Sequence, residues 1–346
     1  MEKRNSVLIG MSGGVDSSVS ALILKQKGFD VHGVTFKLSK YQDTKSFDDA
    51  SEVAKKLGIQ HEIIDISEEF NKEVIEYFLT EYQKGRTPNP CVVCNRQVKF
   101  HQLIRYADQR GIDLVGTGHY ARVDKNDTRY FLRKARDIKK DQSYFLYRLT
   151  QDQLKRAIFP LGSMNKKDVR VLAEKYELKV ADKEDSQDIC FIHDNDYRSF
   201  VEDNSKGQFE CGDIVDTSGK KIGTHSGFFK YTIGQRKGLG ISSNKPLYVT
   251  GIDAVRNVVI VGDEEELYTS QFEVCDVNLM AIDRLNKPLE VLVKVRSGST
   301  PVPAVIATLD NGNILVKFNQ KQRAVTSGQS AVFYENDILV GGGIIV

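Results

Sequence analysis

The first half of the chain alternates short apolar runs with longer stretches whose apolar residues recur at helical spacing. Strands are predicted at 7–9, 31–36, 61–66 and 113–118, and helices at 15–27, 47–57, 67–84 and about 96–110. Gly28, Gly58 and Gly85 are expected to end the first three helices, and Ser67 to cap the third. This alternation predicts a parallel, doubly wound α/β sheet with its functional site at the carboxyl ends of the strands.

The pattern changes near residue 205. From there the chain is rich in Gly, Val, Ile and Thr, and short alternating runs such as PLYVTGI and LEVLVKVR are separated by turn signals. Such runs are typical of antiparallel β structure. We therefore expect three domains: an α/β domain over 1–204, a small central β-rich module over 205–270, and a C-terminal β-barrel over 271–346.

Composition adds limits to this picture. The 346 residues are 40% hydrophobic, and none of the apolar runs approaches the ~20 residues needed to cross a bilayer. The N-terminus is interpreted as a first strand and not as a signal peptide, and five sparse cysteines favour the reducing cytoplasm over a disulfide framework. The run RYFLRKARDIKK at 129–140 is strongly basic, which is typical of a solvated face or of a surface that binds nucleic acid phosphates.

The string GMSGGVDSS at 10–18 directly follows the first predicted strand and opens a helix. Glycines let the backbone approach a phosphate, and helix N-terminal N–H groups bind it. The lysine of a Walker A loop is missing, and a plain Gly-Ser turn that caps the helix would explain the glycines alone. The whole string resembles the pyrophosphate loop of the ATP pyrophosphatases, which adenylate their substrates. The nucleotide-binding candidates are Gly10, Met11, Ser12, Gly13, Gly14, Val15, Asp16 and Ser17.

Cys91 and Cys94 lie behind a double-proline turn in TPNPCVVCNRQVKF at 87–100. Taken alone, this spacing fits a metal knuckle, a redox pair or a site that handles sulfur.

Further motifs narrow the choice. They are GRTPNPxxxCNRxVKF, GTGHYAR at 116–122, KDQSYFL at 140–146, EDSQDICFI at 184–192, GFFKYTIGQRKGLGI at 227–241 and SGQSAVFY at 327–334. Together and in this order they resemble the tRNA-specific 2-thiouridylases over essentially the whole chain. The resemblance implies an enzyme that uses ATP and Mg²⁺ to adenylate the C2 oxygen of the wobble uridine in the anticodon arm and then replaces that oxygen by sulfur.

The resemblance also implies roles for two cysteines. Cys94 is expected nearest the target base, and Cys190 is expected to carry the persulfide whose sulfur displaces AMP. Cys94 then resolves the carrier, which leaves a Cys94–Cys190 disulfide. A thiolate at neutral pH needs nearby positive charge, for which Arg96 is a candidate.

Position 91 departs from the better-known form of the motif, which has an acid there that is assigned as a base. With Cys91 in its place, the identity of the base is open, and three alternatives remain for the thiols. Cys94 and Cys190 could act as a persulfide pair; Cys91, Cys94 and Cys190 could hold a [4Fe–4S] cluster; or these three with His193 could bind zinc.

The remaining roles also follow from the resemblance. Phe36 and Gly118 are expected beside the adenosine, although both could be ordinary packing and turn positions. Asn89, Pro90 and Cys91 are expected to border the target base. The other positions expected to contact tRNA are His119, Lys140, Asp141, Gln142, Arg296, Ser297 and Gln329. Ser297 stands where the family more usually has an aromatic ring, so the contact there is expected to be weaker.

The resemblance further implies a protein partner, either a sulfur-donor protein or a cysteine desulfurase relay, and a chain that acts as a monomer. Two alternatives remain: a different adenylating enzyme, such as a lysidine or citrulline ligase, and a zinc-stabilised RNA-binding module. The first would share the loop but lack Cys94 and Cys190, and the second would need no pyrophosphate loop.

Overall fold

The computed structural model describes residues 5–39, 44–183, 189–192, 196–205 and 209–346. Its N-terminal part is built on a five-stranded sheet in the order β3-β2-β1-β4-β7, and every pair in it is parallel. The strands are β1 (Ser6–Gly10), β2 (Asp30–Lys37), β3 (Gln60–Asp65), β4 (Leu114–Gly116) and β7 (Ala157–Ile158).

Both faces of this sheet are covered, which confirms the doubly wound prediction. Val7 and Ile9 of β1 pack in one apolar cluster with α1 (Val15–Gln26), α2 (Lys45–Leu57) and α8 (Lys166–Lys175). The residue between them, Leu8, points to the other face and packs with α6 (His101–Gln109). Successive side chains of a strand alternate between faces, so a run with no polar residue requires cover on both sides.

A long helical stretch connects β3 to the cysteine region. It runs through α3 (Ser67–Phe70), a π-helical segment η1 (Asn71–Ile75) and α4 (Glu76–Gln83). Ser67 is the first residue of this helix and not its cap. The N-cap position is Ile66, whose side chain makes no capping hydrogen bond, so the prediction was wrong by one residue. The Asp65 carboxylate accepts from the Ser67 N–H at 3.0 Å and from its hydroxyl at 2.6 Å.

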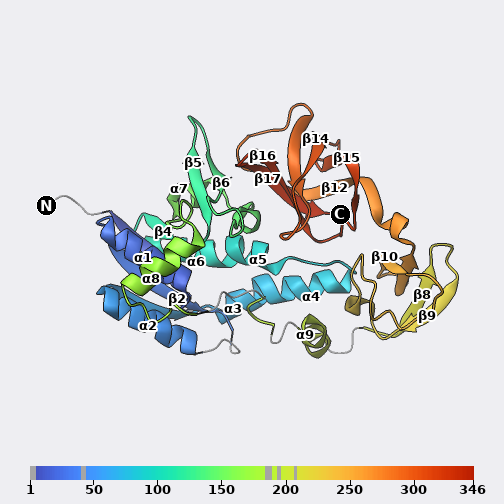
Figure 1. The fold of residues 1–346 in the computed structure, drawn as a ribbon, viewed down its shortest axis with the longest axis horizontal. Coiled ribbons are helices and arrows are strands. Elements are labelled where there is room, and N and C mark those ends of the chain that lie inside the picture. Colours follow the sequence, from blue (N-terminus) through green and yellow to red (C-terminus); the bar gives the residue numbers. More distant parts are fainter. Residues whose placement is uncertain (1–4, 40–43, 184–188, 193–195, 206–208) are drawn as a thin grey trace.

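The polypeptide then turns back beneath the barrel (Figure 1) and enters α5 (Pro90–Val93), which continues into a second π-helical segment, η2 (Cys94–Phe100), and into α6. Shorter helical elements follow: η3 (Ser143–Leu146), α7 (Gln151–Arg156) and α9 (Tyr197–Asn204).

The central module is a four-stranded sheet in the order β10-β11-β8-β9. Its strands are β8 (Gly212–Asp216), β9 (Lys221–His225), β10 (Tyr248–Asp253) and β11 (Val258–Gly262). The β8–β9 and β10–β11 hairpins are antiparallel, as predicted, but β8 and β11 pair in parallel. Local alternation could not show this pair, because its partners are about 40 residues apart in the sequence.

The C-terminal part is the predicted barrel. Its strands are β12 (Tyr268–Leu279), β13 (Leu289–Lys294), β14 (Val302–Thr308), β15 (Ile314–Arg323), β16 (Ser330–Glu335) and β17 (Ile338–Ile345). They follow the order β12-β15-β14-β13-β16-β17, and pairing of β12 with β17 closes the sheet around an apolar interior. The exact limits at residues 204 and 270 stay a prediction.

A hairpin from the first half of the chain extends the barrel sheet. The hairpin consists of β5 (Ala121–Lys125) and β6 (Tyr130–Lys134), and β6 pairs with β17. The first part of the basic run thus forms the strand β6. Arg133 forms ion pairs with Asp124 and Asp337, both at 2.8 Å. Part of the positive charge that suggested a nucleic acid surface therefore joins the α/β region to the barrel, as Figure 1 shows for β5 and β6 beside β17.

Candidate functional site

The glycine-serine loop lies at the carboxyl end of β1, where the sequence predicted the site. The Ser17 hydroxyl accepts from the Ser12 N–H at 3.1 Å and donates to the Gly14 carbonyl at 3.2 Å, which folds the loop over the first turn of α1. Ser12 is exposed. The loop and the free N–H groups of the first turn of α1 together offer hydrogen-bond donors of the kind that bind phosphate.

Other members of the loop fix its position. Met11 is 2% exposed, its N–H donates to the Val34 carbonyl at 2.8 Å, and its carbonyl accepts from the Thr35 hydroxyl at 2.6 Å. Val15, the first residue of α1, is buried. Gly13 lies so close to the Ser46 carbonyl oxygen that a Cβ built on Gly13 would be 2.1 Å from it. These residues hold the loop, while Ser12 and Asp16 remain accessible.

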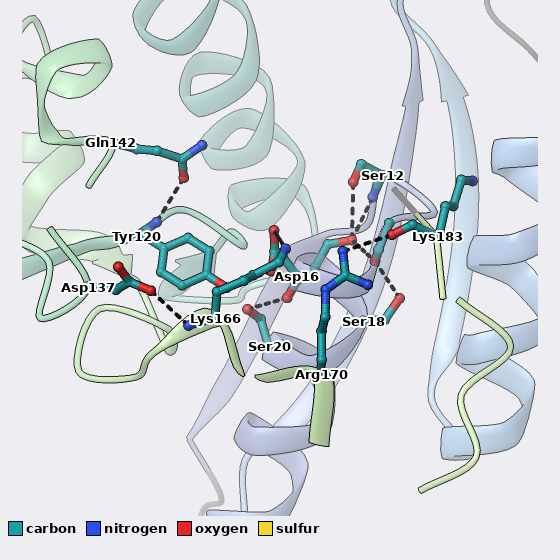
Figure 2. Close-up of polar contacts among 12 residues, drawn as sticks. Ser12, Asp16, Ser18, Ser20, Tyr120, Asp137, Gln142, Lys166, Arg170 and Lys183 are labelled. Atoms are coloured by element: carbon teal, nitrogen blue, oxygen red, sulfur yellow. Dashed lines mark hydrogen bonds and ion pairs between the residues drawn. The ribbon is translucent and has the colours of Figure 1, made fainter. Parts of the chain in front are cut away.

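Asp16 is the centre of a network of polar contacts (Figure 2). The Lys166 ammonium donates to both carboxylate oxygens at 2.8 Å, and the Tyr120 hydroxyl donates to one of them at 2.7 Å. Asp137 accepts from the backbone N–H of Lys166 at 3.0 Å, and Gln142 accepts from that of Tyr120 at 2.9 Å. The Asp16 side chain remains 31% exposed, so an oxygen ligand is available at the mouth of the loop.

A second lysine supports the loop from the other side. The Lys183 ammonium donates to the Gly13 carbonyl at 3.0 Å and to the nearly buried Asp49 carboxylate at 2.7 Å. Sequence reasoning missed both Lys166 and Lys183. They lie about 150 and 170 residues after the loop, outside every motif that was recognised, so local pattern carried no signal for them.

The two residues expected near the adenosine lie at the same edge of the sheet. Phe36 is close to the end of β2, is half-buried and packs against Tyr106 with ring centroids 6.1 Å apart. Gly118 follows β4, and a Cβ built on it would lie 2.7 Å from the Ser17 backbone nitrogen. Its turn therefore packs directly on the first turn of α1.

The structure brings the two catalytic candidates into one neighbourhood. Cys94 is buried at the start of η2, in the same apolar cluster as Phe191 and Ile192, which follow Cys190. Cys190 itself is exposed, and Cys91 in α5 is partly exposed. These observations place Cys91, Cys94 and Cys190 around a common region at the amino end of the η2–α6 helix.

Lys99 acts electrostatically on all three thiols. Burial raises the pKa of Cys94 to about 12, a value that already includes the opposing charge of Lys99. The surrounding protein also desolvates the thiols of the partly exposed Cys91 and of Cys190, whose residue is exposed overall, and raises the pKa of both, whereas the charge of Lys99 lowers it. Burial disfavours the charged form of Lys99 and lowers its pKa. The negative charge that the three neighbouring sulfurs carry when ionised has the opposite effect and outweighs burial, so the pKa of Lys99 is raised. The cation that acts on the thiols is thus Lys99, five positions after Cys94 in the π-helical segment, whereas the sequence indicated Arg96.

The arrangement of the thiols bears on the metal alternatives. Within the described ranges, no three His, Cys, Asp or Glu side chains lie close enough together to hold a metal ion. That spacing is the one a single ion requires, whereas the thiolates of a [4Fe–4S] cluster bind different irons, so the cluster alternative for Cys91, Cys94 and Cys190 stays a prediction. His193, the fourth ligand of the zinc alternative, lies outside the described residues.

The residues expected at the target base flank α5. Asn89 precedes the helix with extended backbone, and Pro90 is its first residue, where a missing N–H costs nothing.

His119 lies in the turn after β4. Its imidazole is hydrogen-bonded to the Thr117 hydroxyl at 2.8 Å and packs against the rings of Phe100 and Phe159. Burial, followed by the charge of Lys99, lowers the pKa of His119 to about 3, so its imidazole is neutral. The RNA contacts of these residues stay predictions.

The segment at 140–142 is tied into the protein. The Asp141 carboxylate accepts from the Ala135 N–H at 2.9 Å and from the Ser143 hydroxyl at 2.8 Å. Gln142 exchanges hydrogen bonds with the backbone of Tyr120, and Lys140 donates its N–H to the Asp137 carbonyl at 3.0 Å. Tyr120 therefore connects this segment to the nucleotide loop: its backbone is hydrogen-bonded to Gln142, and its hydroxyl donates to Asp16.

The three barrel candidates differ in their surroundings. Arg296 donates to the carbonyls of Ala324 at 2.9 Å and Ile233 at 3.4 Å, so it links the barrel to the central module. Ser297 is exposed. Gln329 donates to the Thr87 carbonyl at 2.8 Å, which places this barrel residue against the loop that leads to Cys91.

None of the helices in the described part of the chain combines the length and apolar character that crossing a bilayer requires.

Comparison with known families covers nearly the whole chain. The family described as "tRNA methyl transferase HUP domain" matches residues 5–194, "tRNA methyl transferase PRC-barrel domain" matches 198–263, and "Aminomethyltransferase beta-barrel domain" matches 269–345.

Full-length relatives are more specific. The chain is 48% identical over 359 aligned positions to "tRNA-specific 2-thiouridylase MnmA 1" of Caldanaerobacter subterraneus subsp. tengcongensis, covering 100% of this chain and 99% of the relative. It is 47% identical to "tRNA-specific 2-thiouridylase MnmA" of Acetivibrio thermocellus, covering 99% of each chain. It is 45% identical to the protein of the same name from Clostridioides difficile, covering 100% of this chain and 99% of that one.

Proposed function

The chain belongs to the family of tRNA-specific 2-thiouridylases, and from this premise we propose that it replaces the C2 oxygen of the wobble uridine of tRNA by sulfur at the expense of ATP. One observation supports the proposal most strongly. A single chain places a pyrophosphate-type loop with an accessible Asp16 at the carboxyl edge of its sheet, and it gathers Cys94, Cys190 and Lys99 in one further region. The first feature suits adenylation, and the second suits transfer of sulfur.

In the first step, ATP binds with its phosphates against Ser12 and the first turn of α1. The uridine C2 oxygen attacks the α-phosphorus, and pyrophosphate leaves. This converts the oxygen from a poor leaving group into part of AMP. Asp16 is the oxygen ligand in the loop that suits Mg²⁺, which when bound neutralises charge on the phosphates. Lys166 holds the Asp16 carboxylate in place through both of its oxygens.

In the second step, the terminal sulfur of a persulfide on Cys190 attacks C2, and AMP leaves with the former C2 oxygen. The Cys94 thiolate then attacks the Cys190 sulfur and breaks the sulfur–sulfur bond. The products are 2-thiouridine and a Cys94–Cys190 disulfide, which a thiol reductant opens before the next cycle. The persulfide itself comes from a sulfur-donor protein or a cysteine desulfurase relay. Because the cycle needs reduced thiols, we place it in the cytoplasm.

Lys99 supports this step through charge. Burial raises the pKa of Cys94 to about 12 even with Lys99 beside it, so this thiol carries almost no thiolate at neutral pH before substrates bind. Lys99 lowers the pKa of Cys94, Cys91 and Cys190 and so increases the reactive fraction of each.

Two variants separate the steps. Asp16→Asn is expected to abolish release of pyrophosphate while tRNA binding persists, because the acid acts on ATP. Cys94→Ser is expected to keep release of pyrophosphate and lose 2-thiouridine. Asp127→Asn, at an exposed turn between β5 and β6, is a matched control for loss of one carboxylate. An Asp16→Asn enzyme that thiolates at nearly the wild-type rate would contradict the assignment of the loop.

A further inference from the structure

Two segments that are about 240 residues apart in sequence meet beside the cysteines. One, here named the cysteine strap, comprises residues 85–91; the other, the barrel turn, comprises residues 327–329 between β15 and β16. The Thr87 N–H donates to the Ser327 carbonyl at 2.9 Å. In the opposite direction the Gln329 side-chain amide donates to the carbonyls of Thr87 at 2.8 Å and Pro88 at 3.3 Å.

The cysteine strap depends on partners outside itself. Pro88 and Pro90 have no backbone N–H, and prolines hold the residues before them, Thr87 and Asn89, in extended conformations. Such a segment cannot form a helical turn that would satisfy its own carbonyls. A primary amide carries two N–H donors, and Gln329 directs both to this segment. The barrel turn therefore supplies what the strap lacks.

The barrel turn is itself fixed to the last strand of the barrel. The Gly328 N–H donates to the Ile345 carbonyl at 2.9 Å, and the Ile345 N–H donates to the Gln329 carbonyl at 2.8 Å. Gly328 has φ +87°, which favours glycine, and a Cβ there would lie 2.9 Å from the Arg86 Cβ and 3.0 Å from the Thr87 nitrogen. The close approach of barrel and strap thus requires glycine at this position.

We propose that Gln329 is a positioning residue, which acts through Thr87 and Pro88 to set the place of α5 and hence of Cys91 and Cys94. The strap is stiff between the anchored Pro88 and the first turn of α5, so a shift at the anchor moves Cys91, three residues further along. The barrel thereby aligns the cysteine region through the hydrogen bonds that the Gln329 amide donates to the strap. The role in sulfur transfer rests on the proposed function, whereas the mechanical link does not.

The test uses the full-length protein with three variants. Gln329→Met keeps the size of the side chain and removes both donors. Gly328→Ala adds a methyl group against Arg86 and Thr87 without removing a side chain that could touch RNA. Gln320→Met, at an exposed position of β15, is the matched control. For each we would measure hydrogen exchange at residues 86–94, alkylation of Cys91 without tRNA, tRNA affinity at fixed salt, and kcat for thiolation.

We expect Gln329→Met and Gly328→Ala to accelerate exchange at Thr87 and alkylation of Cys91 by about tenfold, the effect of losing one or two hydrogen bonds. Thiolation kcat should fall by about the same factor, tRNA affinity should stay within about twofold of wild type, and Gln320→Met should change none of these.

Weaker tRNA binding by Gln329→Met with wild-type exchange and alkylation would overturn the inference in favour of a direct RNA contact. Wild-type exchange and alkylation in Gly328→Ala would overturn it as well. If the wild-type protein fails to thiolate tRNA, the proposed function fails, and the exchange and alkylation results still decide the mechanical link.

Discussion

At the scale of single residues, the cysteine region combines burial with one cation. Cys94 is 4% exposed, which protects a thiol from oxidants but also raises its pKa, and Lys99 partly reverses that rise. The sequence motifs identified both catalytic cysteines because each lies in a specific string. They could not identify Lys99, because part of its role involves Cys190, which lies about 90 residues away in the sequence. Phe191, the residue after Cys190, belongs to the same apolar cluster as Cys94.

The charge of Lys99 can be tested in the protein without substrates. Lys99→Met is expected to raise the pKa of the exposed Cys190 thiol, because a neutral side chain no longer favours the thiolate. Because a smaller fraction of the thiol is then ionised, we expect its alkylation near pH 8 to slow about tenfold. Lys99→Arg keeps the charge and should keep the profile. The check is the rate of Cys190 alkylation against pH by mass spectrometry, and coincident profiles for Lys99→Met and wild type would remove Lys99 from this role.

Position 91 distinguishes the two sulfur routes. If Cys94 and Cys190 carry the chemistry, Cys91→Asp should retain substantial activity in air with a sulfurtransferase donor, because the new carboxylate restores the commoner acid and meets the positive charge of Lys99. The measurement is 2-thiouridine formed per enzyme with iron chelated. An oxygen-sensitive enzyme with stoichiometric iron, inactive as Cys91→Asp, would favour the cluster route instead.

At the scale of elements, the nucleotide loop is held by what packs around α1. The turn after β4 presses Gly118 against the first turn of that helix, and Tyr120, two residues later, reaches Asp16. Four strands of the α/β sheet and the helices between them were predictable because apolar spacing is a local property, whereas the two-residue β7 and the later helix α8 were not predicted. The β5–β6 hairpin was missed, because the apolar Phe131 and Leu132 lie within a run that was interpreted by its charge, and its partner strand β17 is some 200 residues away.

Gly118→Ala tests the contact between this turn and α1. A methyl group 2.7 Å from the Ser17 nitrogen must displace the first turn of the helix, which carries the N–H groups expected to bind phosphate. We expect ATP affinity to fall at least tenfold with tRNA affinity unchanged, measured by calorimetry with a non-hydrolysable analogue. Gly111→Ala is the control, because a Cβ there meets nothing within 4 Å, although its φ of +65° makes some loss of stability expected. Unchanged ATP affinity in Gly118→Ala would contradict this role.

At the scale of the whole molecule, the three parts of the chain are joined by specific polar contacts. Arg296 joins the barrel to the central module, Arg133 joins the β5–β6 hairpin to the barrel, and Gln329 joins the barrel to the cysteine strap. The family resemblance predicted Arg296 and Gln329 as RNA contacts. Sequence alone could not reveal the partners that these two residues have outside the barrel, Ile233 for Arg296 and Thr87 and Pro88 for Gln329, because these partners are about 60 and 240 residues away in the sequence.

Arg296 and Lys140 should therefore differ when each is replaced by alanine. Arg296→Ala removes the Arg296 hydrogen bonds to the Ile233 carbonyl and to the Ala324 carbonyl, which keeps only the Thr326 hydroxyl as donor, and we expect the free energy of unfolding to fall by about 1–3 kcal/mol. Lys140→Ala should leave stability within about 0.5 kcal/mol and reduce the log–log salt slope of tRNA binding by about one. Urea unfolding and binding at several salt concentrations would check both, and equal stabilities of the two variants would contradict the structural role of Arg296.

The most direct measurement is a single turnover of the protein loaded with one persulfide, incubated with Mg²⁺, ATP and a tRNA that carries an unmodified wobble uridine. We predict one 2-thiouridine, one AMP and one pyrophosphate per persulfide, together with a Cys94–Cys190 disulfide in the peptide map. Cleavage of ATP to ADP and phosphate, or formation of 2-thiouridine at an undiminished rate by Cys190→Ser, would contradict adenylation followed by transfer of sulfur from the Cys190 persulfide.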